Sequence, residues 1–160
     1  MKILILYYYK GGNTRKLADA IGQGAAQVDG VEVVLRHAKD VTQDDFTTAQ
    51  GLIIGSPVYF GTMAAQLKQV LDQFVGLRRS MENKVGAAFA TSADASGGKE
   101  TTMLSIIQAM LIYGMVIVGD PLAATGHYGT ACVGAPDSAA EENGRKLGRR
   151  VAELVKQLQR

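Results

Sequence analysis

Two neighbouring aromatic residues, Tyr59 and Phe60, lie in a stretch whose composition predicts a loop. The stretch covers residues 55–63, with the sequence GSPVYFGTM, and follows the short apolar run 52–54. Pro57 fixes its own φ and biases the residue before it away from helix, so a strand must end there. The two glycines of the stretch permit a tight bend or the close approach of a flat group. Aromatic residues at the carboxyl end of a strand predict a wall for a planar ligand, and simple cover of the sheet edge is the alternative.

A second candidate for chemistry is the segment 9–15, with the sequence YKGGNTR, which lies between an apolar run and a helical pattern. Its backbone N–H groups would face outward at a helix N-terminus, where the helix dipole favours an anion. Thr14 adds a hydroxyl, Asn13 an amide and Lys10 a positive charge, while Gly12 leaves the backbone accessible. The spacing is neither that of a Walker loop nor G-x-G-x-x-G. It predicts a phosphate site of another kind, and a helix cap with glycines for the turn is the alternative.

Small polar residues make up a third loop, 91–98, which also follows an apolar run. A phosphate at the first loop and a planar ring between the other two is the arrangement that flavin mononucleotide (FMN) needs. The polar edge of the ring would then take hydrogen bonds from the backbone of the third loop. The sequence therefore predicts FMN as the cofactor.

The remaining pattern predicts the elements that hold these loops. Near-continuous apolar runs predict buried strands over 3–7, 31–35, 52–55, 85–90 and 115–118. Apolar residues at helical spacing predict helices over about 14–28, 62–76, 100–113 and from Ser138 to the C-terminus, the last with Ser138 and Glu141 as a capping box. The inward face of the third of these helices is expected to include Met103, Leu104, Ile107, Met110 and Leu111.

Three segments between these elements carry no such pattern. Residues 40–50 predict a loop with one helical turn, 77–83 a charged connection, and 119–136 a long loop. The alternation of strands and helices predicts one α/β domain over residues 1–160. We expect a doubly wound, five-stranded parallel sheet in the order 2-1-3-4-5, with helices on both faces.

Composition narrows the class of protein. The hydrophobic share of 47% and the charged share of 20% are typical of a globular domain. The single cysteine, Cys132, excludes an internal disulfide and favours a reducing compartment, so we expect a cytoplasmic protein. No apolar run approaches membrane-spanning length, and the apolar start is too short for a signal peptide, so no membrane partner is expected.

Charge and histidine content argue against two kinds of binding site. The net charge is +2, and the basic residues near the C-terminus alternate with glutamates, which favours a solvated helix face over a nucleic-acid surface. His37 and His127 have no cysteine or acid at ligand spacing, so no metal site is expected.

These motifs together resemble the flavodoxin-like FMN-binding proteins, and among them the WrbA branch of NAD(P)H:quinone oxidoreductases. The resemblance spans nearly the whole chain in order, and the block 55–68 is its most specific part. The matching segments are 6–8, 55–68, 91–92, 97–101, 114–119 and 128–129.

The resemblance implies a residue for each part of the cofactor. The phosphate would bind Lys10, Gly12, Asn13 and Thr14, the ring Pro57, Val58, Tyr59, Phe60 and Gly61, and the ribityl and pyrimidine side Thr91, Ser92, Ala93, Asp94 and Gly97. Tyr113 stands where the WrbA branch often has histidine, and His127 and Tyr128 lie in the long loop. These three residues are candidates for substrate contacts, with packing at a helix end as the alternative for Tyr113.

The resemblance also implies an activity. It points to an enzyme that transfers hydride from NAD(P)H to a quinone or similar acceptor, without a catalytic side chain because the flavin carries the hydride. It further implies a homo-oligomer, either a dimer or a tetramer. A flavodoxin-type electron carrier is the alternative, although that family is usually strongly acidic and this chain has Lys10 and Arg15 beside the predicted phosphate loop. A flavin-free domain on the same fold is a third hypothesis.

Overall fold

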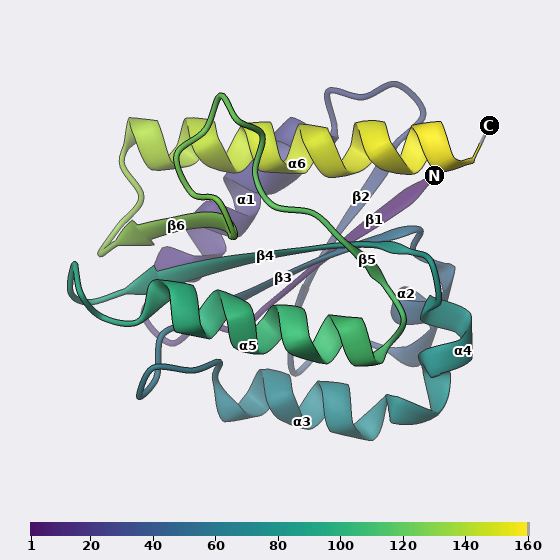
Figure 1. Ribbon diagram of the computed structural model, residues 1–160, viewed down its shortest axis with the longest axis horizontal. Helices are drawn as coiled ribbons and strands as arrows, with labels where there is room; N and C mark the ends of the chain where they lie inside the picture. Colours follow the sequence, from purple (N-terminus) through teal and green to yellow (C-terminus); the bar gives the residue numbers. More distant parts are fainter. Residues whose placement is uncertain (160) are drawn as a thin grey trace.

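The computed structural model describes residues 1–159 and has a parallel sheet between two layers of helices (Figure 1). The strands are β1 (Lys2–Tyr7), β2 (Glu32–His37), β3 (Gly51–Pro57), β4 (Val85–Ser92), β5 (Val116–Ile117) and β6 (Gly129–Val133). The helices are α1 (Asn13–Ala25), α2 (Gln43–Thr48), α3 (Ala65–Gln73), α4 (Arg78–Met81), α5 (Lys99–Ile112) and α6 (Ser138–Leu158), with a short 3₁₀ turn η1 (Val75–Leu77). Arg160, which the predicted last helix includes, lies outside the described residues.

The strand order is β2-β1-β3-β4-β5 with all pairs parallel, which confirms the predicted doubly wound sheet. The position beside β4 is filled by two strands rather than one. Val116 pairs with the start of β4, while Gly129 pairs with Ala88 further along the same strand. Between them the chain leaves the sheet and returns, so the sheet has six strands and the predicted count of five is wrong.

β6 escapes prediction because its sequence, GTACV, has small residues and no apolar run. It lies within 119–136, which the sequence predicts to be one long loop. The loop that remains between β5 and β6 is held by α6. Arg150 donates to the carbonyl oxygen of Asp120 (2.5 Å), and Lys146, one turn earlier on the helix, donates to that of Ala123 (3.0 Å). Lys146 and Arg150, two basic residues of α6, therefore anchor this loop.

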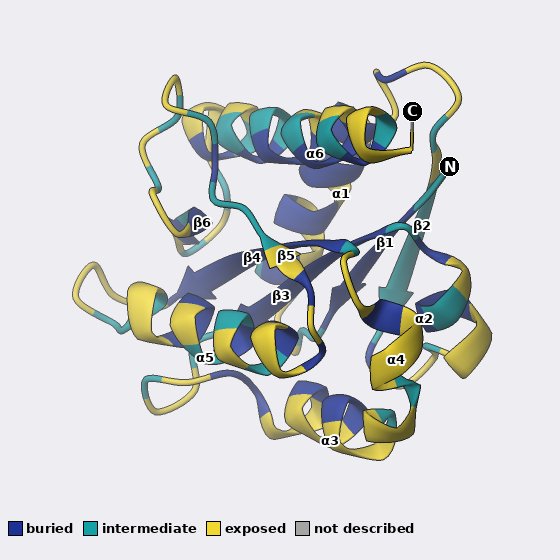
Figure 2. Ribbon diagram, turned by 45° about the vertical axis from the view of Figure 1, so that its right-hand side comes forward, coloured by how far each residue is buried: buried dark blue, intermediate teal, exposed yellow. Residues whose placement is uncertain are grey.

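The sheet has a hydrophobic core on each face, and alternate residues of β1 pack into the two cores. Ile3 and Ile5 face α1 and α6, whereas Leu4 and Leu6 face the layer formed by α2 to α5, and all four side chains are fully buried. Figure 2 shows the central strands coloured as buried along most of their length, while the longer helices carry both buried and exposed residues. A strand covered on both faces needs this continuous apolar sequence, as predicted from the run 3–7.

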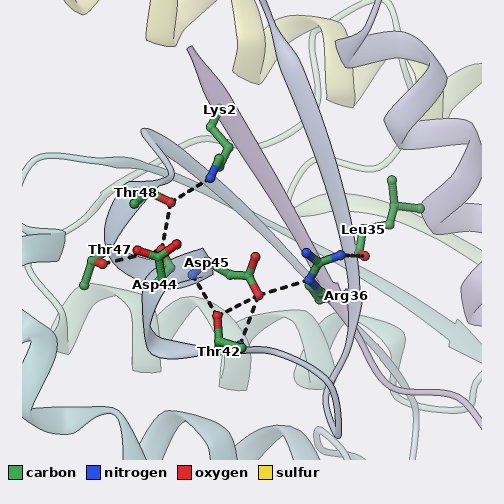
Figure 3. A network of polar contacts seen from close by, with 8 residues as sticks. All are labelled: Lys2, Leu35, Arg36, Thr42, Asp44, Asp45, Thr47 and Thr48. Carbon is green, nitrogen blue, oxygen red and sulfur yellow. Dashed lines mark hydrogen bonds and ion pairs between the residues drawn. The ribbon is translucent and has the colours of Figure 1, made fainter.

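Two helical segments, α4 and α6, differ from the prediction, whereas α2 is the helical turn expected within 40–50. α4 forms inside the expected connection 77–83, and α2 is a short helix with a capping box between Thr42 and Asp45 (Figure 3). α6 begins with Asp137 as its N-cap, whose carboxylate accepts a hydrogen bond from the N–H of Ala140 (2.8 Å), so the predicted capping box from Ser138 is wrong. Asp137 stands at the extended residue before the first turn, which is the geometry that an N-cap requires.

On α5 the predicted inward face is only partly correct. Met103 and Met110 are buried as expected, but Leu104 and Leu111 are 36% and 56% exposed. α5 carries apolar residues on most of its circumference, so periodicity alone does not identify the side that faces the sheet.

The capping box of α2 also fixes the end of β2. Arg36 on β2 donates from Nε to the carboxylate of Asp45 (3.0 Å), which accepts from the hydroxyl and the N–H of Thr42 as well (Figure 3). Burial alone would raise the pKa of Asp45, but the hydrogen bonds from Arg36 and Thr42 outweigh burial and lower it. The guanidinium of Arg36 therefore has a structural role, because it links β2 to α2.

α1 and α6 approach each other backbone to backbone through glycines. A Cβ atom on Gly148 of α6 would overlap the carbonyl oxygen of Ile21, and one on Gly24 of α1 would overlap the carbonyl oxygen of Arg145. No side chain fits at either contact, so these two glycines set the distance between the helices. The position of α1 on the sheet depends on that distance.

We predict that Gly148→Ala lowers the free energy of unfolding by about 1–3 kcal/mol, because the added methyl group forces the two helices apart. Gly76→Ala is the matched control, since a Cβ there meets no atom within 4 Å, and it should change stability by about 0.5 kcal/mol or less. Urea denaturation followed by circular dichroism measures both. Equal stability of the two variants would contradict the packing described.

Candidate functional site

Three loops meet at the carboxyl edge of the sheet, after β1, β3 and β4 (Figure 1). They are residues 8–12, 58–64 and 93–98, called here the first, second and third loops. The hydroxyls of Thr14 and Thr91 lie 2.8 Å apart, and the N–H of Val58 donates to the carbonyl oxygen of Thr91 (2.8 Å). Thr14 and Thr91 are 2% and 5% exposed. Thr91 therefore connects all three loops.

The first loop leads into a helix whose first turn is open. Gly12 precedes α1 with φ 95°, and no side chain of residues 1–159 caps the helix there. The first turn holds no acidic residue, and a Cβ on Gly11 or Gly12 would meet no atom within 4 Å. The N–H groups of this turn therefore point into accessible space at the positive end of the helix dipole, beside the exposed Lys10. This geometry suits an anion such as a phosphate group.

Thr14 has a partner that the sequence does not predict. In the pair with Thr91 one hydroxyl donates to the other, and the second proton remains for an acceptor outside the pair. The pair thus holds the first and third loops together and keeps one donor available. Both residues belong to the predicted site, but their contact joins segments far apart in the sequence.

The second loop contains a tight hairpin. Tyr59 and Thr62 exchange two backbone hydrogen bonds of 3.1 Å, and the residues between them, Phe60 and Gly61, have φ of 51° and 77°. Positive φ at both central positions is typical of a type I′ turn. A phenylalanine in this conformation costs on the order of 1 kcal/mol, and its ring is fully exposed. A strained, solvent-exposed aromatic residue indicates a binding role.

Hydroxyl side chains outside the predicted set hold this hairpin in place. Thr101 on α5 donates to the carbonyl oxygen of Gly61 (2.6 Å), and the Ser105 hydroxyl accepts from the N–H of Met63 (3.3 Å). The fully buried Ser56 accepts from the N–H of the residue that precedes α3 (2.8 Å). The signal that could have identified two of them is the spacing of Thr101 and Ser105, one turn apart at the start of a helix.

The third loop is a compact turn with an open rim. Ser92 donates its hydroxyl proton to the carbonyl oxygen of Asp94 (2.7 Å), and the N–H of Gly97 donates to the same oxygen (3.1 Å). Ala93 and Asp94 are exposed, whereas Ser92 is buried. All fourteen predicted cofactor residues, from Lys10 to Gly97, thus lie on the three loops or on the ends of the elements that they join.

The three candidates for substrate contacts lie elsewhere. Tyr113 follows α5 at the opposite end of the sheet, is 4% exposed and donates its hydroxyl to the carbonyl oxygen of Leu71 (2.5 Å). Burial raises its pKa to about 12, as expected of a core phenol. His127 and Tyr128 directly precede β6, whose first residue pairs with the middle of β4. The structure does not bring these three residues to the loops.

Other potential reactive groups are structural. Burial raises the pKa of Cys132 to about 11, which disfavours a reactive thiolate. Within residues 1–159 no group of three or more His, Cys, Asp or Glu is arranged to hold a metal ion. Among the helices of the same residues, none is long and apolar enough to cross a membrane.

Comparison with known proteins places the chain in a family. Residues 39–130 match the model of the family described as NADPH-dependent FMN reductase. The chain belongs to this family. Two of its relatives are a flavodoxin of Aquifex aeolicus, 35% identical over 96% of this chain and 86% of that one, and an NAD(P)H dehydrogenase (quinone) of Archaeoglobus fulgidus, 32% identical over 98% of both.

A solved structure agrees in fold. The flavodoxin, WrbA-like protein from Agrobacterium tumefaciens superposes with a TM-score of 0.83 over 98% of both chains at 22% identity. The prediction of a flavodoxin-like, FMN-binding oxidoreductase family is confirmed by the family model and the relatives. FMN is the cofactor of the NADPH-dependent FMN reductases, and the three loops fit it: an open helix N-terminus for phosphate, an exposed aromatic hairpin for a ring, and a polar turn beside it.

We predict that Thr14→Val weakens FMN binding about tenfold, because it removes a hydroxyl that can donate to the phosphate and leaves Thr91 without its partner. Thr48→Val, at an exposed position of α2, is the control and should leave affinity unchanged. Fluorescence titration of the apoprotein with FMN measures both dissociation constants. If Thr14→Val and the native protein bind FMN equally well, the first loop does not hold the phosphate.

Proposed function

We propose that this member of the NADPH-dependent FMN reductase family transfers hydride from NAD(P)H to a quinone or similar acceptor. The observation that carries the proposal is the placement of an open helix N-terminus and an exposed aromatic hairpin at one edge of the sheet. Bound FMN supplies the capacity to accept and release a hydride. The side chains and backbone of the three loops supply position and electrostatics.

Each loop has a separate task in this proposal. The N–H groups of Gly12, Asn13 and Thr14, together with the charge of Lys10, hold the phosphate. Pro57, Val58 and the hairpin 59–62 cover one side of the ring and exclude water from it. The third loop, from Thr91 to Gly97, lies along the ribityl and pyrimidine side and offers backbone groups to the polar edge. No side chain at this edge is assigned as acid or base.

The names of relatives support both donor and acceptor. The Archaeoglobus fulgidus relative is an NAD(P)H dehydrogenase (quinone) and matches this chain over nearly its whole length. The Aquifex aeolicus relative is named a flavodoxin, which supports an electron carrier as the second candidate. The net charge of +2 favours the enzyme, since cationic surroundings stabilise added negative charge and hence two-electron reduction.

We propose that the protein acts as a homo-oligomer, a dimer or a tetramer. α5 supports this because Leu104 and Leu111 lie on its solvent side, in addition to the buried Met103, Ile106 and Met110. A helix that is apolar around most of its circumference is normally covered on more than one side. Burial of Leu104 and Leu111 against a second copy would remove their exposed surface from water.

We also propose a cytoplasmic location and neither nucleic-acid nor membrane partners. A reducing compartment suits the thiol of Cys132 and the use of NAD(P)H. On α6, Arg145 pairs with Glu142 (2.9 Å) and Arg149 with Glu153 (2.8 Å), so these two arginines are engaged by neighbouring acids. Such pairing supports a solvated helix face.

We predict that NADPH or NADH, added without oxygen to the FMN-loaded protein, bleaches the flavin absorbance within seconds. A quinone added afterwards should restore it. A stopped-flow spectrophotometer measures both phases, with free FMN as the control. Flavin that binds but is not bleached would reject the enzyme and favour the electron carrier.

We predict that Leu111→Lys lowers the molecular mass in solution, because a buried lysine is costly at an apolar contact. Leu158→Lys on α6, also an exposed leucine, should leave the mass unchanged. Sedimentation velocity of the native protein and both variants tests this. A native protein that sediments as a monomer would reject the oligomer.

A further inference from the structure

An apolar groove begins at the aromatic hairpin and continues between α3 and α5. Its volume is about 770 Å³, which lies within the range of about 300–1,000 Å³ that is usual for small-molecule clefts. Tyr59 and Phe60 line its upper end. Met63 and Ala65 line the side of α3, and Ala109 and Ile112 that of α5.

The groove is continuous with the proposed ring site, because Tyr59 and Phe60 belong to both. A quinone whose ring lies against the flavin, beside the hairpin, can therefore extend a substituent between the helices. Along α5 the groove reaches from Ser105 to Ile112, which is two helical turns or about 10 Å. A quinone ring alone would occupy only the part nearest the hairpin.

The side chains that line the groove determine which kind of ligand substituent fits between the helices. The lining is mostly apolar, and of its polar side chains Thr62, Gln66, Lys68 and Gln108 are exposed to solvent. The remaining one, Ser105, already accepts from the N–H of Met63 and donates to the carbonyl oxygen of Thr102. Lys68 is already paired with Asp72 (2.6 Å). An elongated hydrocarbon chain that needs no hydrogen bonds suits this surface better than a polar or charged group.

We propose that this groove binds the prenyl tail of a quinone whose ring lies against the bound flavin, beside the hairpin. The inference rests on the proposed quinone reduction and specifies the class of quinone, namely one with a hydrophobic tail. The groove adjoins the surface proposed for oligomerisation but does not include Leu104 or Leu111. Ser105, Ala109 and Ile112 follow one another at helical spacing on the flank of α5, while Leu104 and Leu111 lie on its outer side.

The first experiment compares ubiquinones with no, one and two prenyl units, which share one reactive ring. We expect kcat/KM to rise about tenfold with each prenyl unit, the gain from burying roughly two methylene groups. Values that do not depend on tail length would overturn the proposal. Failure to reduce even the tail-less quinone would instead refute the proposed function, so the two failures are distinguishable.

A variant separates the groove from general hydrophobicity. Ala109→Phe places a ring in the groove, and the ratio of kcat/KM for the two-unit quinone over the tail-less quinone should fall from about 100 to near one. Ala139→Phe makes the same substitution at an exposed position of α6 and should keep the native ratio. Equal ratios in the two variants would overturn the proposal.

A binding measurement provides a readout independent of turnover. Methyl signals of Met63 and Ile112 in ¹³C-labelled, FMN-loaded protein should shift when the two-unit quinone is added and stay unchanged with the tail-less one. These shifts report binding in the groove even if the quinone is not reduced. If neither quinone moves them, or if Ala109→Phe lowers the sedimenting mass, a second copy of the chain or nothing fills the groove, and the proposal is wrong.

Discussion

The contact on which the site depends is the buried hydroxyl pair of Thr14 and Thr91. It joins residues 77 positions apart and determines where the start of α1 lies relative to the end of β4. A buried hydroxyl without a partner costs about 1–3 kcal/mol, so the two loops are confined to positions in which the pair forms. The carbonyl of Thr91 then places Val58, and with it the aromatic hairpin. Three separate loops thereby become one surface.

α1 is fixed from its other end by close backbone contact. Gly24 and Gly148 allow α1 and α6 to meet where a methyl group has no room, and Thr14 fixes the first turn of α1 at the sheet edge. A helix held at both ends keeps its open N–H groups in one place. The anion site is therefore organised by the fold itself, which reduces the entropy that a ligand must overcome on binding.

The sequence is sufficient for features that depend on local patterns. The run 3–7, the turn at Pro57 and the glycines of the first loop each imply an element or a loop by themselves, and the alternation of strands and helices along the chain predicts the strand order. Contacts between distant hydroxyls, such as Thr14 with Thr91, have no local signature. β6 is missed because GTACV gains its place only by pairing with β4. The buried face of α5 is predicted only in part, because Leu104 and Leu111 are apolar and lie at the helical spacing that core residues have.

The features that sequence rules explain least lie around α5 and the hairpin. Phe60 has an unfavourable φ and an exposed ring, and Thr101 prevents the turn from relaxing against the protein. α5 presents apolar side chains toward the sheet, toward the groove and toward solvent, although only the first of these contributes to folding. Departures of this kind are expected where function rather than stability selects the residue. The rigid hairpin and the side of α5 that lines the groove together offer a hydrophobic ligand a site that exists before the ligand binds.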